Sequence, residues 1–158
     1  MAKYYAGIGS RKTPEDVLEF MTRFARVLAS KGYILRSGGA DGADTAFAKG
    51  ANKKEILRPK HASAEAIKIA MDIHPAPQHC NEYVRKLHGR NVQIILGENL
   101  DKPVDFVVCW SPGGKAIGGT GLGIRLADRE SIIVYNLFKQ DDLLMLAERF
   151  LYDEADES

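Results

Sequence analysis

Short apolar runs alternate along this chain with longer segments in which apolar residues recur at helical spacing. The short runs predict strands, because they are rich in β-branched and aromatic residues and end at turn residues. They begin at Tyr4, Tyr33, Glu55, Val104 and Ile132. Helical segments follow them, so the pattern predicts an α/β, Rossmann-like three-layer domain: a mostly parallel sheet of about five strands with helices on both faces.

The helices have recognisable start and stop signals. Thr13, Pro14 and Asp16 predict a capped start for the first helix, and Gly32 is expected to end it. Asp41 and Asp44 are expected to cap the second helix. Further helices are expected over residues 41–51 and 81–96, in a segment that ends near residue 129, and around residues 143–150.

The chain of 158 residues is long enough for one domain with a substantial core, which we assign to residues 1–152. Residues 60–80 depart from the alternation of strand and helix, so we expect an irregular insertion there. Residues 153–158 form an acidic C-terminal tail. The run from Val104 to Trp110 is almost wholly apolar, which predicts a central strand that is covered on both faces.

Composition narrows the class of protein. The net charge of +1 gives no overall attraction for nucleic acid or for an anionic membrane. Cys80 and Cys109 lie far apart in the sequence and do not indicate a disulfide framework. The sequence contains no leader-like segment and no apolar run long enough to span a bilayer. We therefore expect a cytoplasmic protein without a membrane partner.

A glycine-rich turn, residues 36–44, joins the second strand to the second helix. Gly38 and Gly39 lack a Cβ that would block a close approach, and the N-terminus of the following helix offers free N–H groups and a favourable dipole. The turn is therefore a candidate phosphate site, and the alternative is a plain connection. A second glycine-rich turn, residues 111–121, follows the fourth strand in the same way.

In parallel sheets, residues that follow the strands converge at the carboxyl edge, where ligands bind. The residues at these positions are hydroxyls, glycines, guanidiniums and an amide, which suit phosphate and sugar. They are Gly9, Ser10, Arg11, Ser37, Gly38, Gly39, Asp41, Arg58, Ser111, Gly113, Gly114 and Asn136.

These motifs resemble the superfamily that joins the DNA-processing protein Smf (DprA) to the LONELY GUY phosphoribohydrolases, known as SLOG. The resemblance rests on Gly9-Ser10-Arg11, on the run from Ser37 to Asp44, and on Arg90-Asn91. It also includes Pro112-Gly113-Gly114 followed by Gly119-Thr120, although residues 115–118 interrupt this motif. The similarity extends from Tyr4 to about Ser131 and is greatest to small stand-alone members found in phages and bacteria.

The resemblance implies a nucleotide ligand and a homo-oligomer, a dimer or larger. Arg90 is implied to pair with phosphate and Asn91 with a ribose hydroxyl. The residues implied to hold the rest of the nucleotide are Gly9, Ser10, Ser37, Gly38, Gly39, Gly113, Gly114, Gly119 and Thr120. For an isolated Arg-Asn pair, a solvated helix surface would be the better interpretation.

One departure from the superfamily favours binding over catalysis. The phosphoribohydrolases carry a glutamate three positions after the threonine of their Gly-Thr motif, and Gly123 occupies that position here. Nucleotide binding without turnover, as a sensor or a sponge, is therefore our first interpretation. N-glycosidic hydrolysis of a nucleoside monophosphate is the alternative, with Arg90, Asp41 and Asp44 as its catalytic residues.

Single-stranded DNA binding is the third function considered. It is ranked last because Lys53-Lys54 and Arg85-Lys86 are short and form no basic track. Trp110 can stack on a base or close the core, and the core is the commoner place for such a residue. No cofactor and no metal is predicted, because the spacing of the histidines and cysteine between residues 61 and 88 matches no common zinc pattern.

Overall fold

Strands and helices alternate along most of the chain, as the sequence pattern predicts, and two helices, α3 and α4, lie between β3 and β4. The computed structural model describes residues 2–152. The strands are β1 (Lys3–Gly7), β2 (Tyr33–Ser37), β3 (Lys54–Ile56), β4 (Phe106–Cys109) and β5 (Ile133–Asn136). The helices are α1 (Glu15–Ser30), α2 (Ala43–Gly50), α3 (Ala64–Ile73), α4 (Glu82–Leu96), α5 (Gly118–Arg129) and α6 (Gln140–Phe150). The tail predicted at residues 153–158 lies outside the described residues.

All five strands are parallel and lie in the order β3-β2-β1-β4-β5. From β1 the chain continues to one side of the sheet through β2 and β3, and it later returns to the other side through β4 and β5. The Rossmann-like α/β prediction is therefore confirmed. The direction reverses between β1 and β4, and a crevice that opens at such a point is the usual ligand site of these folds.

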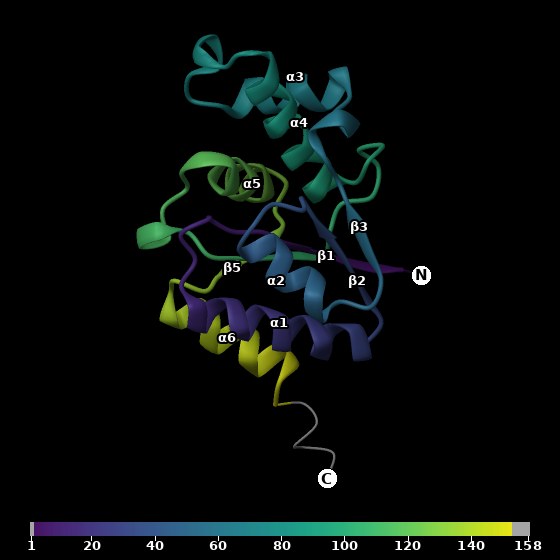
Figure 1. The fold of residues 1–158 in the computed structure, drawn as a ribbon, viewed down its shortest axis with the longest axis vertical. Coiled ribbons are helices and arrows are strands. Elements are labelled where there is room, and N and C mark those ends of the chain that lie inside the picture. Colours follow the sequence, from purple (N-terminus) through teal and green to yellow (C-terminus); the bar gives the residue numbers. More distant parts are fainter. Residues whose placement is uncertain (1, 153–158) are drawn as a thin grey trace.

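Side chains alternate along the strands and fill a core on each face of the sheet. Tyr5 on β1 is the register partner of Phe106 on β4, and both pack with Phe24, Phe47 and Phe150 from α1, α2 and α6. The next residues along the strands, Ala6 and Val107, belong to the opposite core, which α3, α4 and α5 cover. Figure 1 shows these two layers of helices, with α1 and α6 below the sheet and α4 and α5 above it.

The segment predicted as an insertion contains a regular helix. Helix α3 begins after Ser63, whose Oγ accepts a hydrogen bond from the Ala66 amide, and two short 3₁₀ turns, Pro59–His61 and Pro77–His79, flank the helix. It packs on α4 where Gly89 allows a close approach, because a Cβ at Gly89 would lie 2.7 Å from Ile67 Cγ1. The segment is thus an outer layer on α4 (Figure 1).

Two predicted helix caps are wrong. Helix α1 has Pro14 at its N-cap, and the Thr13 hydroxyl donates to the Ser10 carbonyl, 2.5 Å away, so it does not cap the helix. Helix α2 has Gly42 at its N-cap, and Asp44 lies inside its first turn. In both cases the polar side chain stabilises the preceding turn, which competes with capping for the same group.

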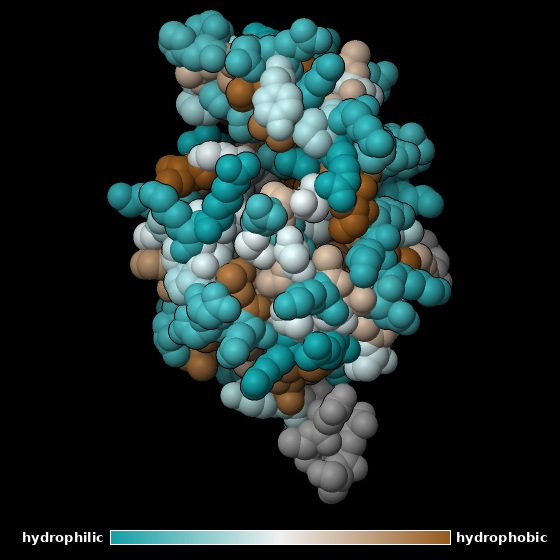
Figure 2. Space-filling model, in the orientation of Figure 1, coloured by the Kyte–Doolittle hydropathy of each residue, from teal (hydrophilic) through white to brown (hydrophobic). Residues whose placement is uncertain are grey.

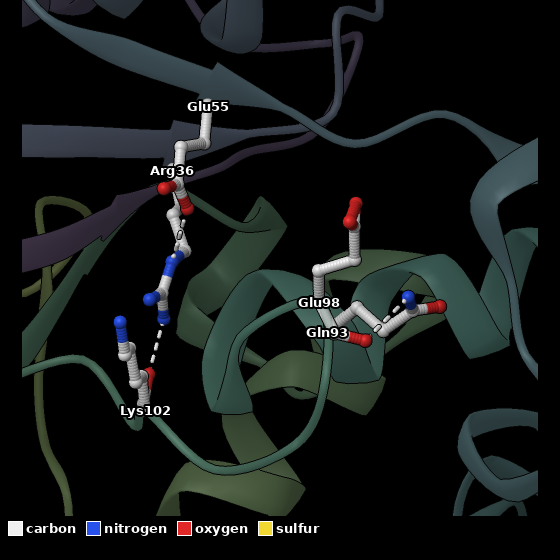
Figure 3. A network of polar contacts seen from close by, with 5 residues as sticks. All are labelled: Arg36, Glu55, Gln93, Glu98 and Lys102. Atoms are coloured by element: carbon white, nitrogen blue, oxygen red, sulfur yellow. Dashed lines mark hydrogen bonds and ion pairs between the residues drawn. The ribbon is translucent and has the colours of Figure 1, made fainter.

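Arg36 joins β2 to its neighbours on the α4 side of the sheet (Figure 3). Its guanidinium is buried against the Tyr4 ring, forms an ion pair with Glu55 at 2.9 Å, and donates to the Lys102 carbonyl. Gln93 of α4 donates to the carbonyl of Glu98, 3.0 Å away (Figure 3). These bonds hold the loop after α4 against the sheet.

The face drawn in Figure 2 is predominantly polar. Figure 2 shows hydrophilic residues over most of the visible face, with hydrophobic residues scattered among them. None of the helices within residues 2–152 has the length and the apolar character that a membrane span requires.

Candidate functional site

A pocket of about 530 Å³ opens at the carboxyl ends of β1 and β4, where the strand order reverses. It lies between the turn after β1, the start of α5 and one face of α4. Its lining residues are Ile8, Gly9, Ser10, Arg11, Lys12, Ala40, Asp44, Leu87, His88, Arg90, Asn91, Ile94, Ser111, Pro112, Ile117, Gly118, Gly119 and Thr120.

The structure brings many of the predicted site residues together around this pocket. They are Gly9, Ser10, Arg11, Asp44, Arg90, Asn91, Ser111, Gly119 and Thr120. The predicted residues that do not line it are Ser37, Gly38, Gly39, Asp41, Arg58, Gly113, Gly114 and Asn136. Most of the turn after β2 therefore lies outside the pocket lining.

The turn after β1 is held in place by its own polar groups. The Ser10 amide donates to the Trp110 carbonyl at 3.1 Å, and the Ser10 hydroxyl accepts from the Lys12 amide at 3.0 Å. A Cβ at Gly9 would lie 2.5 Å from the Cβ of Ala43, so only glycine lets the start of α2 approach this closely. Arg11 and Lys12 then project as exposed cations at the pocket edge.

The turn after β2 closes around protein groups. A Cβ at Gly38 would lie 2.8 Å from both Arg90 Nη1 and Asp44 Oδ2, and Gly39 has a φ of +73° that favours glycine. Ser37 is fully buried and donates to the Gly7 carbonyl at 2.7 Å. Direct contact of this turn with a ligand stays a prediction. Within the protein Gly38 admits Arg90, and Gly39 lies against Arg58.

Arg90 ties three parts of the structure together. Its side chain is 8% exposed, and Nη1 donates to the carbonyls of Gly38, 2.7 Å away, and Leu57, 3.1 Å away. Its Nε donates to Asn91 Oδ1 at 2.9 Å. Burial lowers the pKa of Arg90 from its ordinary value, and the nearby Asp44 carboxylate opposes that shift. Within residues 2–152 these bonds use Nε and Nη1, so Nη2 is the nitrogen that remains for a ligand.

Asp44 is a buried carboxyl group in the pocket wall. It is 7% exposed, and its Oδ2 accepts from the Ala40 amide at 3.1 Å. Burial raises the pKa of Asp44 above its ordinary value, and the hydrogen bond from Ala40 and the charge of Arg90 oppose the shift only in part. A buried carboxyl group with a raised pKa beside a guanidinium in a pocket is typical of functional sites.

The start of α5 lines the pocket with backbone amides that have no acceptor among the described residues. Its N-cap residue, Ile117, provides no side-chain cap, and the first bond of the helix runs from the Gly121 amide to the Ile117 carbonyl. The amides of Gly118, Gly119 and Thr120 therefore have no acceptor within the helix. Such a helix start attracts anions through these N–H groups and through the helix dipole.

Sequence reasoning missed several lining residues. Leu87 and Ile94 have helical spacing with Arg90 and Asn91, so the sequence did contain a signal that one face of α4 forms a wall. Ile8, Lys12, Ala40, Pro112 and Gly118 are next to predicted residues, and Ile117 is two positions from Gly119. The sequence suggested His88 only as a metal ligand. Trp110 belongs to the core and is not among the lining residues.

Comparisons with known proteins bear on the fold. No family model and no curated protein matches this chain. Among solved structures, DNA processing protein A from Helicobacter pylori is similar, with a TM-score of 0.58 and 19% sequence identity over 93% of this chain and 72% of that chain. The two chains share a fold. The structure of DNA processing protein A is described for its single-stranded DNA binding mode, and at this identity the similarity extends to the architecture alone.

Proposed function

We propose that the pocket binds a nucleotide through its phosphate. The observation that carries this proposal is the uncapped start of α5, which shares one pocket with Arg90 and the exposed Arg11 and Lys12. Backbone donors, a helix dipole and three cations favour a dianion over any neutral ligand. The pocket volume of about 530 Å³ is in the range of small-molecule sites.

The rest of the pocket suits the sugar and the base. Asn91 and Thr120 offer donors and acceptors for ribose hydroxyls. Ile8, Ile94 and Ile117 provide an apolar wall, and Ile117 is 53% exposed, which is unusual for so large an apolar side chain. A purine or pyrimidine ring packed on this wall would bury that side chain. The polar and apolar parts together match a nucleoside monophosphate better than inorganic phosphate.

Thermal unfolding with matched ligands tests this proposal. A ligand that binds only the folded state raises the melting temperature. Nucleoside monophosphates should protect the protein, while the corresponding nucleosides should not at the same millimolar concentrations. Equal protection by both, or none by either, would refute the phosphate site. Protection by a thymidine oligonucleotide but by no mononucleotide would replace the proposal with single-stranded DNA binding.

A pair of glycine variants tests the location. Gly118, in the pocket, and Gly32, remote from it, both have positive φ, +64° and +87°, and an added Cβ would meet nothing within 4 Å at either position. Gly118→Leu and Gly32→Leu therefore share the left-handed backbone penalty of about 1–2 kcal/mol. Only Gly118→Leu should also abolish the increase in melting temperature that a nucleotide produces. If both variants bind like the parent chain, the site lies elsewhere.

Hydrolysis of the N-glycosidic bond is the second candidate, and Asp44 is the observation that favours it. This carboxyl group lines the pocket, whereas Gly123 does not. A side chain at position 123 would meet the protein, because a Cβ there would lie 2.9 Å from Ile8 Cδ1. Release of free base from nucleoside monophosphates, followed by chromatography, tests the activity. Release that is lost in Asp44→Asn and retained in Asp41→Asn, a change at an exposed residue outside the lining, would establish hydrolysis.

We also propose that the chain forms a homo-oligomer, as the superfamily resemblance implies. Exposed apolar side chains gather on α6 and on the turn before it, at Phe138, Leu144 and Met145. Sedimentation of the parent chain, and of a double variant with Leu144→Glu and Met145→Glu, would test the oligomeric state. A monomeric parent chain would refute the proposal.

A further inference from the structure

Three side chains from separate elements between residues 74 and 88 converge behind the α4 wall of the pocket. His74 follows α3, Cys80 follows the 3₁₀ turn at Pro77–His79, and His88 lies on α4. One nitrogen of each ring and the Cys80 sulfur all lie within 4.8 Å of one another. The ring centroids of His74 and His88 are 4.8 Å apart. The spacing in the sequence gave no sign of this cluster, because α3 and α4 must first pack together.

His88 has an unexplained polar atom. The side chain is 8% exposed, and its Nδ1 is buried without a hydrogen-bond partner among the described residues. An unpaired buried polar atom costs about 1–3 kcal/mol, and an ion is one of the usual reasons for its presence. Burial lowers the pKa of His88, and the neighbouring His74 and Arg90 lower it further.

We propose that His74, Cys80 and His88 bind a divalent transition metal ion such as zinc. Two imidazoles and one thiolate form a donor set that zinc prefers, and three protein ligands leave the fourth tetrahedral position open for water or a ligand. The site is separate from the proposed phosphate contacts. It adjoins the nucleotide pocket, because His88 lines both.

The distances support this assignment. Zinc–nitrogen and zinc–sulfur bonds of about 2.0 and 2.3 Å at a tetrahedral angle place the two ligand atoms about 3.5 Å apart. Cys80 Sγ and His74 Nε2 are 3.6 Å apart. The largest separation in the cluster, up to 4.8 Å, must close by about 1.3–1.5 Å, which side-chain rotation can supply.

Hydrogen bonds from α4 hold the segment that carries Cys80 in place in the metal-free protein. Arg85 of α4 donates to the carbonyls of Cys80 and Pro77, each 3.0 Å away. His74 Nδ1 accepts from the Ala76 amide at 2.9 Å, which places the ring proton on Nε2 in the metal-free protein. Metal binding through Nε2 must move this proton to Nδ1, break the Ala76 bond, and release the thiol proton of Cys80.

Metal titration of the whole chain, stripped with a chelator and kept reduced, tests the site. Zn²⁺ should bind one to one in competition with a chromophoric chelator, and Co²⁺ should give thiolate charge-transfer absorption and the bands of a tetrahedral ion. Cys80→Ser and His88→Gln should each weaken Zn²⁺ binding more than about 100-fold, beyond the usual effect of an outer-shell change.

His79→Gln is the matched control, because His79 is exposed and adjacent to Cys80 but outside the cluster. It should bind Zn²⁺ like the parent chain. Absence of Zn²⁺ binding at micromolar concentrations, or equal affinity in the parent chain and in Cys80→Ser, would overturn the proposal. If Cys80→Ser does not fold, His88→Gln decides the matter, and equal affinity in that variant likewise refutes it. None of these metal titrations uses a nucleotide, so their result is independent of the proposed function.

Discussion

Arg90→Ala tests whether this guanidinium is primarily structural. The change removes charged hydrogen bonds to the carbonyls of Gly38 and Leu57, 2.7 and 3.1 Å from Nη1, and leaves both acceptors buried. Hydrogen bonds to charged groups contribute about 1.5–3 kcal/mol each. Removing a partly desolvated cation recovers some of this energy, so we expect a net loss of about 3 kcal/mol in the free energy of unfolding. For a chain of this size that lowers the melting temperature by about 6–12 °C.

The assay is chemical and thermal unfolding without ligand, followed by nucleotide titration of the folded variant. Phosphate binding should weaken about 10-fold or more, as expected for one charged hydrogen bond. Arg85→Ala is the control, because Arg85 also donates to two carbonyls but does not line the pocket. It should lose stability and keep its affinity. A loss of less than about 1 kcal/mol in Arg90→Ala would refute the structural role.

Three further changes test the site and its support. Gly38→Ala should destabilise the fold by about 1–3 kcal/mol in urea, because the new Cβ lies 2.8 Å from Arg90 Nη1 and Asp44 Oδ2; unchanged stability would contradict this. Burial raises the pKa of Asp44 above 3.8, so its ionisation destabilises the folded state as pH rises above that value. The melting temperature of Asp44→Asn minus that of the parent chain should therefore increase from about pH 4 to about pH 7. Parallel curves of melting temperature against pH for the two chains would contradict this expectation. Gly89→Ala should destabilise the contact of α3 with α4 by about 1–3 kcal/mol in urea, because its Cβ would lie 2.7 Å from Ile67 Cγ1, and an unchanged midpoint would exclude that contact.

The architecture was predictable because each element carries its own pattern. The apolar run before Trp110 became β4, whose four residues are all buried beside the middle strand β1. Helix α4 begins after Asn81, whose Oδ1 accepts from the Val84 amide, and ends at Gly97, as predicted. The ends of elements were harder to predict where a strand pattern runs into a turn residue such as proline. Strand β3 ends at Ile56 and does not extend to Arg58, where the sequence pattern places its end, because Pro59 starts a 3₁₀ turn.

The candidate site was only partly predictable, because turn composition does not say what a turn encloses. A glycine pair such as Gly38-Gly39 can admit a phosphate or a guanidinium equally well. Here Gly38 admits Arg90, and Gly39 lies against Arg58, whose Nη1 would be 2.7 Å from an added Cβ. The convergence of His74 with His88 was also beyond sequence reasoning, because it depends on packing between helices.

The placement of carboxyl groups favours binding over hydrolysis. An oxocarbenium-like transition state needs a negative charge near the anomeric carbon, and the superfamily position for it, Gly123, lies against Ile8 outside the lining. Asp44 lines the pocket from α2, and burial raises its pKa. Protonation of the leaving base needs a general acid, whereas the sugar needs a negative charge. One carboxyl group cannot fill both roles in a single step. Within residues 2–152 the lining includes Asp44 and no second carboxyl group, which favours the proposed nucleotide binding over hydrolysis.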